Sequence, residues 1–161
     1  MIRKLILMRH GIAFEKDADQ TDAERELDPR GIPSIVETAK KINELAGVPQ
    51  VIISSDALRA KQTAMYVAET IGYNPDRTHI NDELYQASAR IFFQTINQLK
   101  DDWEKVLIIG HNPTISYIAE FLSSAEIGSM TEASAVSIEF KIASWSNITQ
   151  GSGKLEQFFT N

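Results

Sequence analysis

The sequence predicts an α/β fold, a three-layer sandwich with a mainly parallel central sheet and helices on both faces. Three short, largely apolar runs, at residues 5–8, 51–55 and 106–110, lack polar alternation and are typical of strands buried on both sides. The stretches between them carry apolar residues at helical spacing, and strand–helix–strand units of this length make the strands parallel. We expect one domain spanning residues 1–161.

The amino-acid composition excludes several classes of protein. With 43% apolar and 24% charged residues, the chain is an ordinary globular protein. It has no cysteine, which excludes disulfides, thiol nucleophiles and thiolate zinc sites and fits a reducing compartment. We see neither a secretory signal nor an apolar run approaching the ~20 residues of a membrane span. A net charge of −6 disfavours nucleic acid, whose phosphates need a basic face. We expect a cytoplasmic protein without membrane or nucleic-acid partners.

The first predicted strand ends abruptly in Arg9, His10 and Gly11. Such an ending delivers a cation and a nucleophile to the sheet edge where open α/β sheets bind ligands. Gly11 lacks a Cβ atom, so the backbone can turn sharply or let a ligand approach. The tripeptide by itself also fits a strand that merely exits to solvent. Residues 15–26 are acidic and polar, and they predict an exposed loop.

A crossover helix and a second strand follow this loop. The helix is expected to begin near Pro33, which suits a first turn, and to end at Gly47, which is a good stop. The strand at residues 51–55 then leads into another helix that runs to about residue 71. Arg59 falls in the first turn of that helix, where its guanidinium and the helix N-terminus can act on one anion.

The next unit repeats the pattern of a strand that ends in a histidine. A short strand is expected within residues 78–84, and a helix with one buried side covers residues 91–99. The third buried strand, at residues 106–110, runs directly into His111. Pro113 suits the start of the helix that follows, because its missing N–H does no harm in a first turn.

The C-terminal part changes character. Residues 135–142 alternate strictly between apolar and polar side chains, which predicts a strand with one exposed face. Residues 154–159 form a closing strand after a polar loop. Together they predict an antiparallel hairpin at the edge of the sheet.

Four side chains are expected to converge at one edge of the sheet. Because parallel strands end on the same edge, Arg9, His10 and His111 should meet there, together with Arg59. Two arginines and two histidines would repel one another unless an anion occupied the site, and a tetrahedral dianion is the natural guest. The set lacks the carboxylate ligands of a metal-dependent phosphatase, so no metal site is expected.

These motifs resemble those of the histidine phosphatase (phosphoglycerate mutase-like) superfamily. Residues 7–11 resemble its signature, residues 54–64 its second motif and residues 110–113 its late histidine motif. The short chain and the segment at residues 83–88 are similar to the SixA group, which removes phosphate from phosphohistidine in signalling proteins. Arg25 matches an arginine that SixA-like proteins carry beside the site.

The resemblance implies a phosphatase acting on a phosphorylated, histidine-containing signalling protein. His10 would attack phosphorus and become transiently phosphorylated, with its other ring nitrogen held by a backbone carbonyl. Arg9 and Arg59 would hold phosphoryl oxygens, and His111 would stabilise the charge spread over them. No metal or organic cofactor is needed. The implied phosphate-binding set is Arg9, His10, Gly11, Arg25, Arg59, His111 and Asn112.

The resemblance also raises the question of a general acid. Superfamily members that act on alcohol phosphates use a carboxylic acid to protonate the leaving oxygen, and Glu83 is the best-placed candidate, although it also fits a solvated turn. One alternative function is a small-molecule phosphomonoesterase with a phosphorylated metabolite as substrate. Another is a non-catalytic phosphate- or phosphoprotein-binding module. The intact His10 argues against that module, because binding alone needs only the cations.

Overall fold

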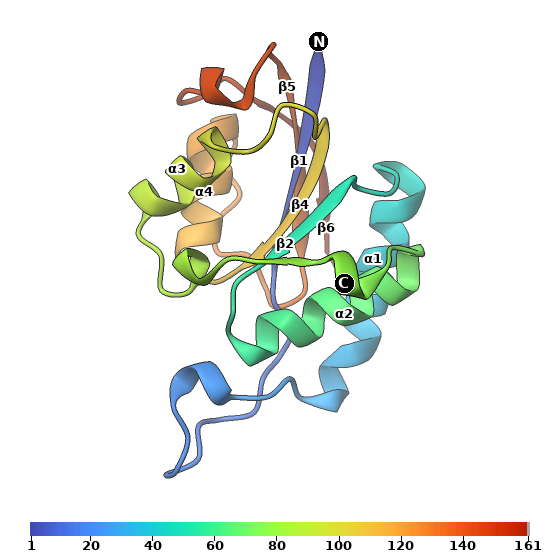
Figure 1. Cartoon of the computed structure of the whole chain (residues 1–161), viewed down its shortest axis with the longest axis vertical. Coiled ribbons are helices and arrows are strands. Elements are labelled where there is room, and N and C mark those ends of the chain that lie inside the picture. Colours follow the sequence, from blue (N-terminus) through green and yellow to red (C-terminus); the bar gives the residue numbers. More distant parts are fainter. Residues whose placement is uncertain (161) are drawn as a thin grey trace.

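The computed structural model describes residues 1–160, which form a six-stranded sheet covered by helices on both faces (Figure 1). The strands, in the spatial order β3-β2-β4-β1-β5-β6, are β1 (Ile2–Arg9), β2 (Val51–Ser54), β3 (His79–Ile80), β4 (Lys105–Gly110), β5 (Ala135–Lys141) and β6 (Lys154–Phe159). The main helices are α1 (Ile32–Leu45), α2 (Leu58–Ile71), α3 (Ala89–Asn97) and α4 (Thr114–Ser123). None of the helices in this described part is long and apolar enough to cross a membrane.

Strand pairing confirms the predicted sheet. The strand β1 pairs in parallel with β4, β4 with β2, and β2 with β3. The strand β5 is antiparallel to β1, and β6 is antiparallel to β5. The carboxyl ends of β1, β2 and β4 therefore lie at one edge, as expected for βαβ connections. The predicted C-terminal hairpin is present, with β6 as its outer strand.

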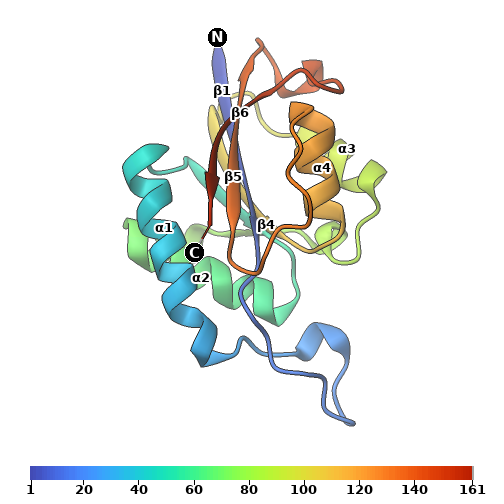
Figure 2. The ribbon, with the colours of Figure 1, turned by 180° about the vertical axis from the view of Figure 1, so that it is seen from behind.

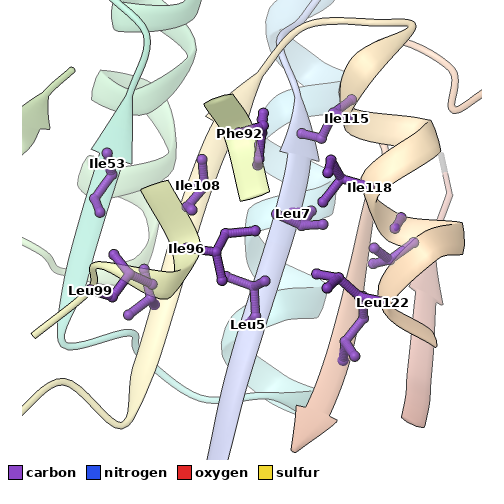
Figure 3. Packing of buried hydrophobic residues seen from close by; sticks show 14 of the residues in the cluster. Leu5, Leu7, Ile53, Phe92, Ile96, Leu99, Ile108, Ile115, Ile118 and Leu122 are labelled. Atoms are coloured by element: carbon purple, nitrogen blue, oxygen red, sulfur yellow. The ribbon is translucent and has the colours of Figure 1, made fainter. Parts of the chain in front are cut away.

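The helices form two layers, with α1 and α2 on one face of the sheet and α3 and α4 on the other (Figures 1 and 2). Successive residues of β1 serve opposite layers, because side chains alternate along a strand. Ile6 and Met8 pack toward α1 and α2. Leu5 and Leu7 pack toward α3 and α4 (Figure 3). All four are fully buried. This double burial explains why the run has no polar positions.

The ends of the helices follow the predicted signals closely. Pro33 occupies the first turn of α1, where a missing N–H costs nothing. Gly72 ends α2 in the left-handed region, with a φ of 77°, and its N–H bonds the Ala68 carbonyl oxygen. A glycine adopts this conformation without the Cβ clash that other residues suffer.

One prediction about the sheet is wrong. The strand β5 does not expose a face, because Ala135 and Ser137 on its more polar side are as buried as its apolar residues. Ala135 belongs to one buried cluster with Ala39 of α1 and Phe159 of β6, so the first layer of helices reaches over this strand as well. Only the end near Lys141 is exposed.

Candidate active site

The register of the sheet places two histidines side by side. Arg9 pairs with Gly110 across the parallel β1–β4 ladder, so the next residues, His10 and His111, leave the sheet together. Their ring centroids lie 5.0 Å apart. The His10 N–H still donates to the Gly110 carbonyl oxygen at 3.2 Å, which fixes the start of the loop. Strand pairing thus brings together residues that are far apart in the chain.

His10 is held in one tautomer. Its Nδ1 lies 2.7 Å from the Gly11 carbonyl oxygen, and a carbonyl only accepts, so Nδ1 carries the proton. Burial, followed by the nearby arginine charges, lowers the pKa of His10 to about 4. The ring is therefore neutral at neutral pH, and its Nε2 keeps a lone pair. The Arg59 Nε–H points at that lone pair over 3.4 Å.

Arg59 enters from the first turn of α2 and is almost completely buried. Its terminal nitrogens bind Asp22 of the loop between β1 and α1. Nη1 donates to the Asp22 carbonyl oxygen at 2.8 Å, and Nη2 donates to the carboxylate Oδ2 at 3.0 Å. The guanidinium is thus held at its far end, while Nε faces His10.

Arg9 has a similar arrangement on the other side of His10. Its Nη1 donates to the Met130 carbonyl oxygen at 2.9 Å, and its Nη2 lies 3.5 Å from the Glu132 carboxylate. The Ala133 N–H contacts the carbonyl oxygens of Arg9 and His10 at 3.1 Å. The loop before β5 therefore fixes both the main chain and the side chain of Arg9.

His111 is oriented by Ser55, the residue directly after β2. The Ser55 Oγ lies 2.7 Å from His111 Nε2 and also accepts the Ala57 N–H at 3.1 Å. Within the described residues, the buried Nδ1 of His111 has no hydrogen-bond partner. Burial lowers the pKa of His111 to about 3, and the positive charge of Arg59 acts in the same direction. His111 is consequently a neutral ring at neutral pH.

A cavity of about 250 Å³ opens over these side chains. It is lined by Arg9, His10, Ile12, Ala13, Arg25, Arg59, His111, Asn112 and Glu132. A larger hollow of about 660 Å³ lies elsewhere, beside Trp103, and contains neither of the paired histidines. We place the site in the smaller cavity, because the buried Arg59 guanidinium and the two histidines with lowered pKa are there.

The charge of the site differs from the sequence expectation. Both histidines are neutral, and the phosphate-binding candidates Arg9 and Arg59 each face a carboxylate, from Glu132 and Asp22. The expected repulsion among four cations is therefore absent. The cavity keeps a positive balance because Arg25 is a third guanidinium in its lining. Among residues 1–160, no cluster of three or more histidine or acidic side chains has the geometry to hold a metal ion.

Most of the predicted site residues meet around this cavity, including Arg25 and Asn112. Gly11 does not line it, because its N–H donates to Thr63 Oγ1 at 3.0 Å and it packs against the core. Glu83 also lies outside. It is exposed in a short 3₁₀ turn (Asp82–Leu84) and borders the larger hollow instead. The prediction of Glu83 as a carboxylate beside the reacting atoms has no geometric basis here.

Sequence reasoning missed four side chains that shape the site. These are Asp22, Ser55, Tyr85 and Glu132. Asp22 looked like one of several acidic residues in an exposed loop, and Glu132 carried no motif. Ser55 lies within residues 54–64, which resemble the second motif, but the motif alone does not predict its contact with His111. No local signal separates Asp22 or Glu132 from its solvated neighbours.

The comparisons with known proteins agree with this geometry. A model of the histidine phosphatase superfamily (branch 1) matches residues 5–87, which include most of the first strand, His10 and Arg59. The chain belongs to this superfamily. A chloroplastic protein of Arabidopsis thaliana, itself uncharacterised, is 29% identical over 134 residues, which are 78% of this chain. The match spans 61% of that relative, so the chain covers less than two thirds of its length.

Solved structures share the whole fold. The protein histidine phosphatase SixA, complexed with tungstate, superposes with a TM-score of 0.80 at 22% identity, covering 98% of this chain and 96% of that chain. A mycobacterial glucosyl-3-phosphoglycerate phosphatase superposes with a TM-score of 0.71 at 18% identity, covering 96% of this chain and 97% of that chain. The fold is therefore that of SixA and related phosphatases.

Proposed function

We propose that this chain is a metal-independent phosphatase that removes the phosphoryl group from phosphohistidine in a signalling protein, acting as one cytoplasmic domain from residue 1 to residue 161. The observation that carries the proposal is the state of His10. Its Nδ1 proton is bound by the Gly11 carbonyl oxygen, while Nε2 keeps its lone pair and faces the Arg59 Nε–H. This is a nucleophile beside a phosphoryl-binding cation.

In the first step, the lone pair of His10 Nε2 attacks phosphorus, and the P–N bond to the substrate imidazole breaks. The bonding electrons return to the nitrogen of the leaving ring. When the other nitrogen of that ring carries a proton, as His10 Nδ1 does, the phosphoryl group passes between two imidazole rings in the same protonation state. No proton then has to move. Such a step needs no general acid, which agrees with the position of Glu83 outside the cavity.

In the second step, water attacks the phosphorus on His10. A P–O bond forms, the P–N bond breaks, and both protons of the water leave with the phosphate, so His10 returns to its neutral form. Arg9 and Arg59 hold the phosphoryl oxygens through charge-assisted hydrogen bonds. The Nδ1 of His111 is buried and has no hydrogen-bond partner within residues 1–160, so it provides a further hydrogen-bonding group for one of these oxygens.

One observation favours a second candidate, a small-molecule phosphomonoesterase. Glu132 lines the cavity and lies 3.5 Å from Arg9, so a carboxylate is present where an alkoxide could leave. Under that alternative, Glu132→Gln should slow alkyl phosphate hydrolysis at least tenfold more than it slows phosphohistidine turnover. Under our proposal, wild-type turnover of alkyl phosphates is already poor.

The test compares a phosphohistidine-containing protein with a panel of phosphomonoesters, in parallel and with EDTA present. We expect EDTA-resistant turnover of the phosphohistidine protein and loss of all turnover in His10→Ala. Labelled substrate should leave acid-labile phosphate on the wild type and none on His10→Ala. The matched control is His79→Ala, because His79 lies outside the cavity and contacts Trp103 instead. Full activity in His10→Ala would eliminate the covalent mechanism.

A further inference from the structure

Asp22 is bound from three directions. Its carboxylate accepts hydrogen bonds from Arg59 Nη2 at 3.0 Å, from the Tyr85 hydroxyl at 2.6 Å and from Arg25 Nη1 at 3.1 Å. These partners belong to α2, to the segment before α3 and to the loop that carries Asp22 itself. A single carboxylate thus joins three segments beside the proposed nucleophile.

The loop holds Asp22 in a defined place. It projects beyond the carboxyl edge of the sheet between β1 and α1 (Figure 1). A bridge between Ala13 and Leu27 closes its base, and the Phe14 N–H donates to the Glu26 carbonyl oxygen at 2.9 Å. At its far end the Thr21 N–H donates to the Glu24 carboxylate at 2.9 Å. The carboxylate is therefore presented by an ordered turn.

Asp22 determines which edge of the Arg59 guanidinium is free. Both terminal nitrogens of Arg59 donate to Asp22, one to its carbonyl and one to its carboxylate. With both terminal nitrogens held in this way, the Nε–H points at His10 Nε2. Without this anchor, a long arginine side chain has several rotamers of similar energy, and few of them direct Nε toward the nucleophile.

We propose that Asp22 is a positioning residue, which acts through Arg59 to hold the guanidinium edge that faces the phosphoryl group on its way to His10. Tyr85 in turn fixes the Asp22 carboxylate. The inference rests on the proposed function and adds a residue to it.

The negative charge of Asp22 distinguishes a positioning role from two others, those of a general acid and of a phosphate-binding group. The hydrogen bond from Tyr85, together with those from Arg25 and Arg59, holds the pKa of Asp22 well below its usual range. Asp22 is therefore ionised and has no proton to donate. Its negative charge also opposes a bound oxyanion. A positioning role thus supports the rate of transfer without strengthening the binding of phosphate.

The test replaces Asp22 by Asn, which keeps the shape and removes the charge. We expect kcat for a phosphohistidine protein to fall about tenfold, because misdirected catalytic groups cost rate. The KM and the affinity for tungstate, measured by thermal shift, should stay equal or improve. Tyr85→Phe should show a smaller loss of the same kind. The matched control is Asp19→Asn, an exposed acidic residue of the same loop.

A double-mutant cycle shows whether the effect passes through Arg59. In an Arg59→Ala background, Asp22→Asn should cause no further loss of kcat. Losses that multiply in the double variant, or a kcat that rises in Asp22→Asn because the carboxylate obstructs the site, would overturn the inference. A wild-type protein without turnover would instead refute the proposed function. Wild-type turnover with an unaltered Asp22→Asn variant would refute only the role of Asp22.

Discussion

His10 is 9% exposed, and its chemistry follows from that burial. Water no longer stabilises the imidazolium, and neighbouring guanidinium groups oppose a further positive charge, so the pKa falls to about 4. The Gly11 carbonyl oxygen selects the tautomer by accepting the Nδ1 proton. A histidine on the surface would lose its lone pair to protonation near pH 6.5. This one remains a nucleophile well below that pH.

The same burial predicts how stability depends on pH. The unfolded chain binds protons at its histidines near pH 6.5, whereas folded His10 resists protonation to about pH 4. The free energy of unfolding should therefore fall as the pH drops through this window, by on the order of 3 kcal/mol from His10. Urea unfolding between pH 7 and pH 4 measures the slope. A His10→Gln variant should show a shallower acid limb, and an unchanged slope would contradict the prediction.

A second prediction at the scale of single residues concerns Glu83. Because it is exposed in a short turn outside the cavity, Glu83→Gln should change kcat and KM for any phosphorylated substrate by less than about twofold. Steady-state kinetics on a phosphohistidine protein and on an alkyl phosphate checks this. A large and selective loss on the alkyl phosphate would restore Glu83 as a general acid.

At the scale of elements, the junction between β1 and α1 depends on a glycine. A Cβ atom at Gly11 would lie 2.7 Å from Ile35 Cδ1 and 3.0 Å from Leu27 Cδ1, both in the core beneath the site. The close approach lets Ile35 of α1 pack directly against Gly11, whose carbonyl oxygen holds the His10 Nδ1. The glycine is needed for packing, whereas the sequence had suggested a role in binding phosphate.

Gly11→Ala should therefore destabilise the protein by about 1–3 kcal/mol, because overpacking forces neighbours out of place. Urea unfolding gives the loss of stability, and kcat should fall as the His10 main chain shifts. Ile35→Val removes the atom nearest to the new methyl group, so Gly11→Ala/Ile35→Val should recover part of both losses. A double variant less stable than Gly11→Ala would show that the clash lies elsewhere.

At the scale of the whole molecule, Arg3 joins segments at the end of the sheet opposite the site. It is 1% exposed, and its guanidinium donates to the carbonyl oxygens of Asp101, Trp103 and Ala143 at 2.9, 3.1 and 2.6 Å. The group also lies over the Trp145 ring, 5.6 Å from its centroid. One buried cation therefore connects the start of β1 to two connections more than 90 residues away along the chain.

Arg3→Met should lower the free energy of unfolding by about 3–5 kcal/mol, because three carbonyl groups lose their charged donor. Turnover at a temperature where the variant stays folded should match the wild type, since Arg3 is far from the cavity. Arg3→Lys keeps the charge without the planar guanidinium, so its free energy of unfolding should lie between those of the wild type and Arg3→Met. Thermal unfolding followed by circular dichroism checks the order, and an Arg3→Met variant as stable as the wild type would contradict it.

The sequence by itself determined the layers of this protein and the edge on which its site lies. Apolar runs without alternation identify strands buried on both faces, and helical spacing identifies the crossovers, because both patterns are set by local geometry. Parallel strands then end on one edge, so Arg9, His10 and His111 had to come close together. The motifs around them indicated the family that the comparisons show.

Only the tertiary structure decided which side chains contact those residues. Asp22 meets Tyr85 across 63 positions of sequence, and Glu132 rather than Glu83 lines the cavity. Burial, which is a property of the packed molecule, lowers the pKa of His10 to about 4 and that of His111 to about 3, so both rings are neutral at neutral pH. Local sequence patterns do not predict such contacts, because side chains from distant segments meet only when the helices have packed on the sheet.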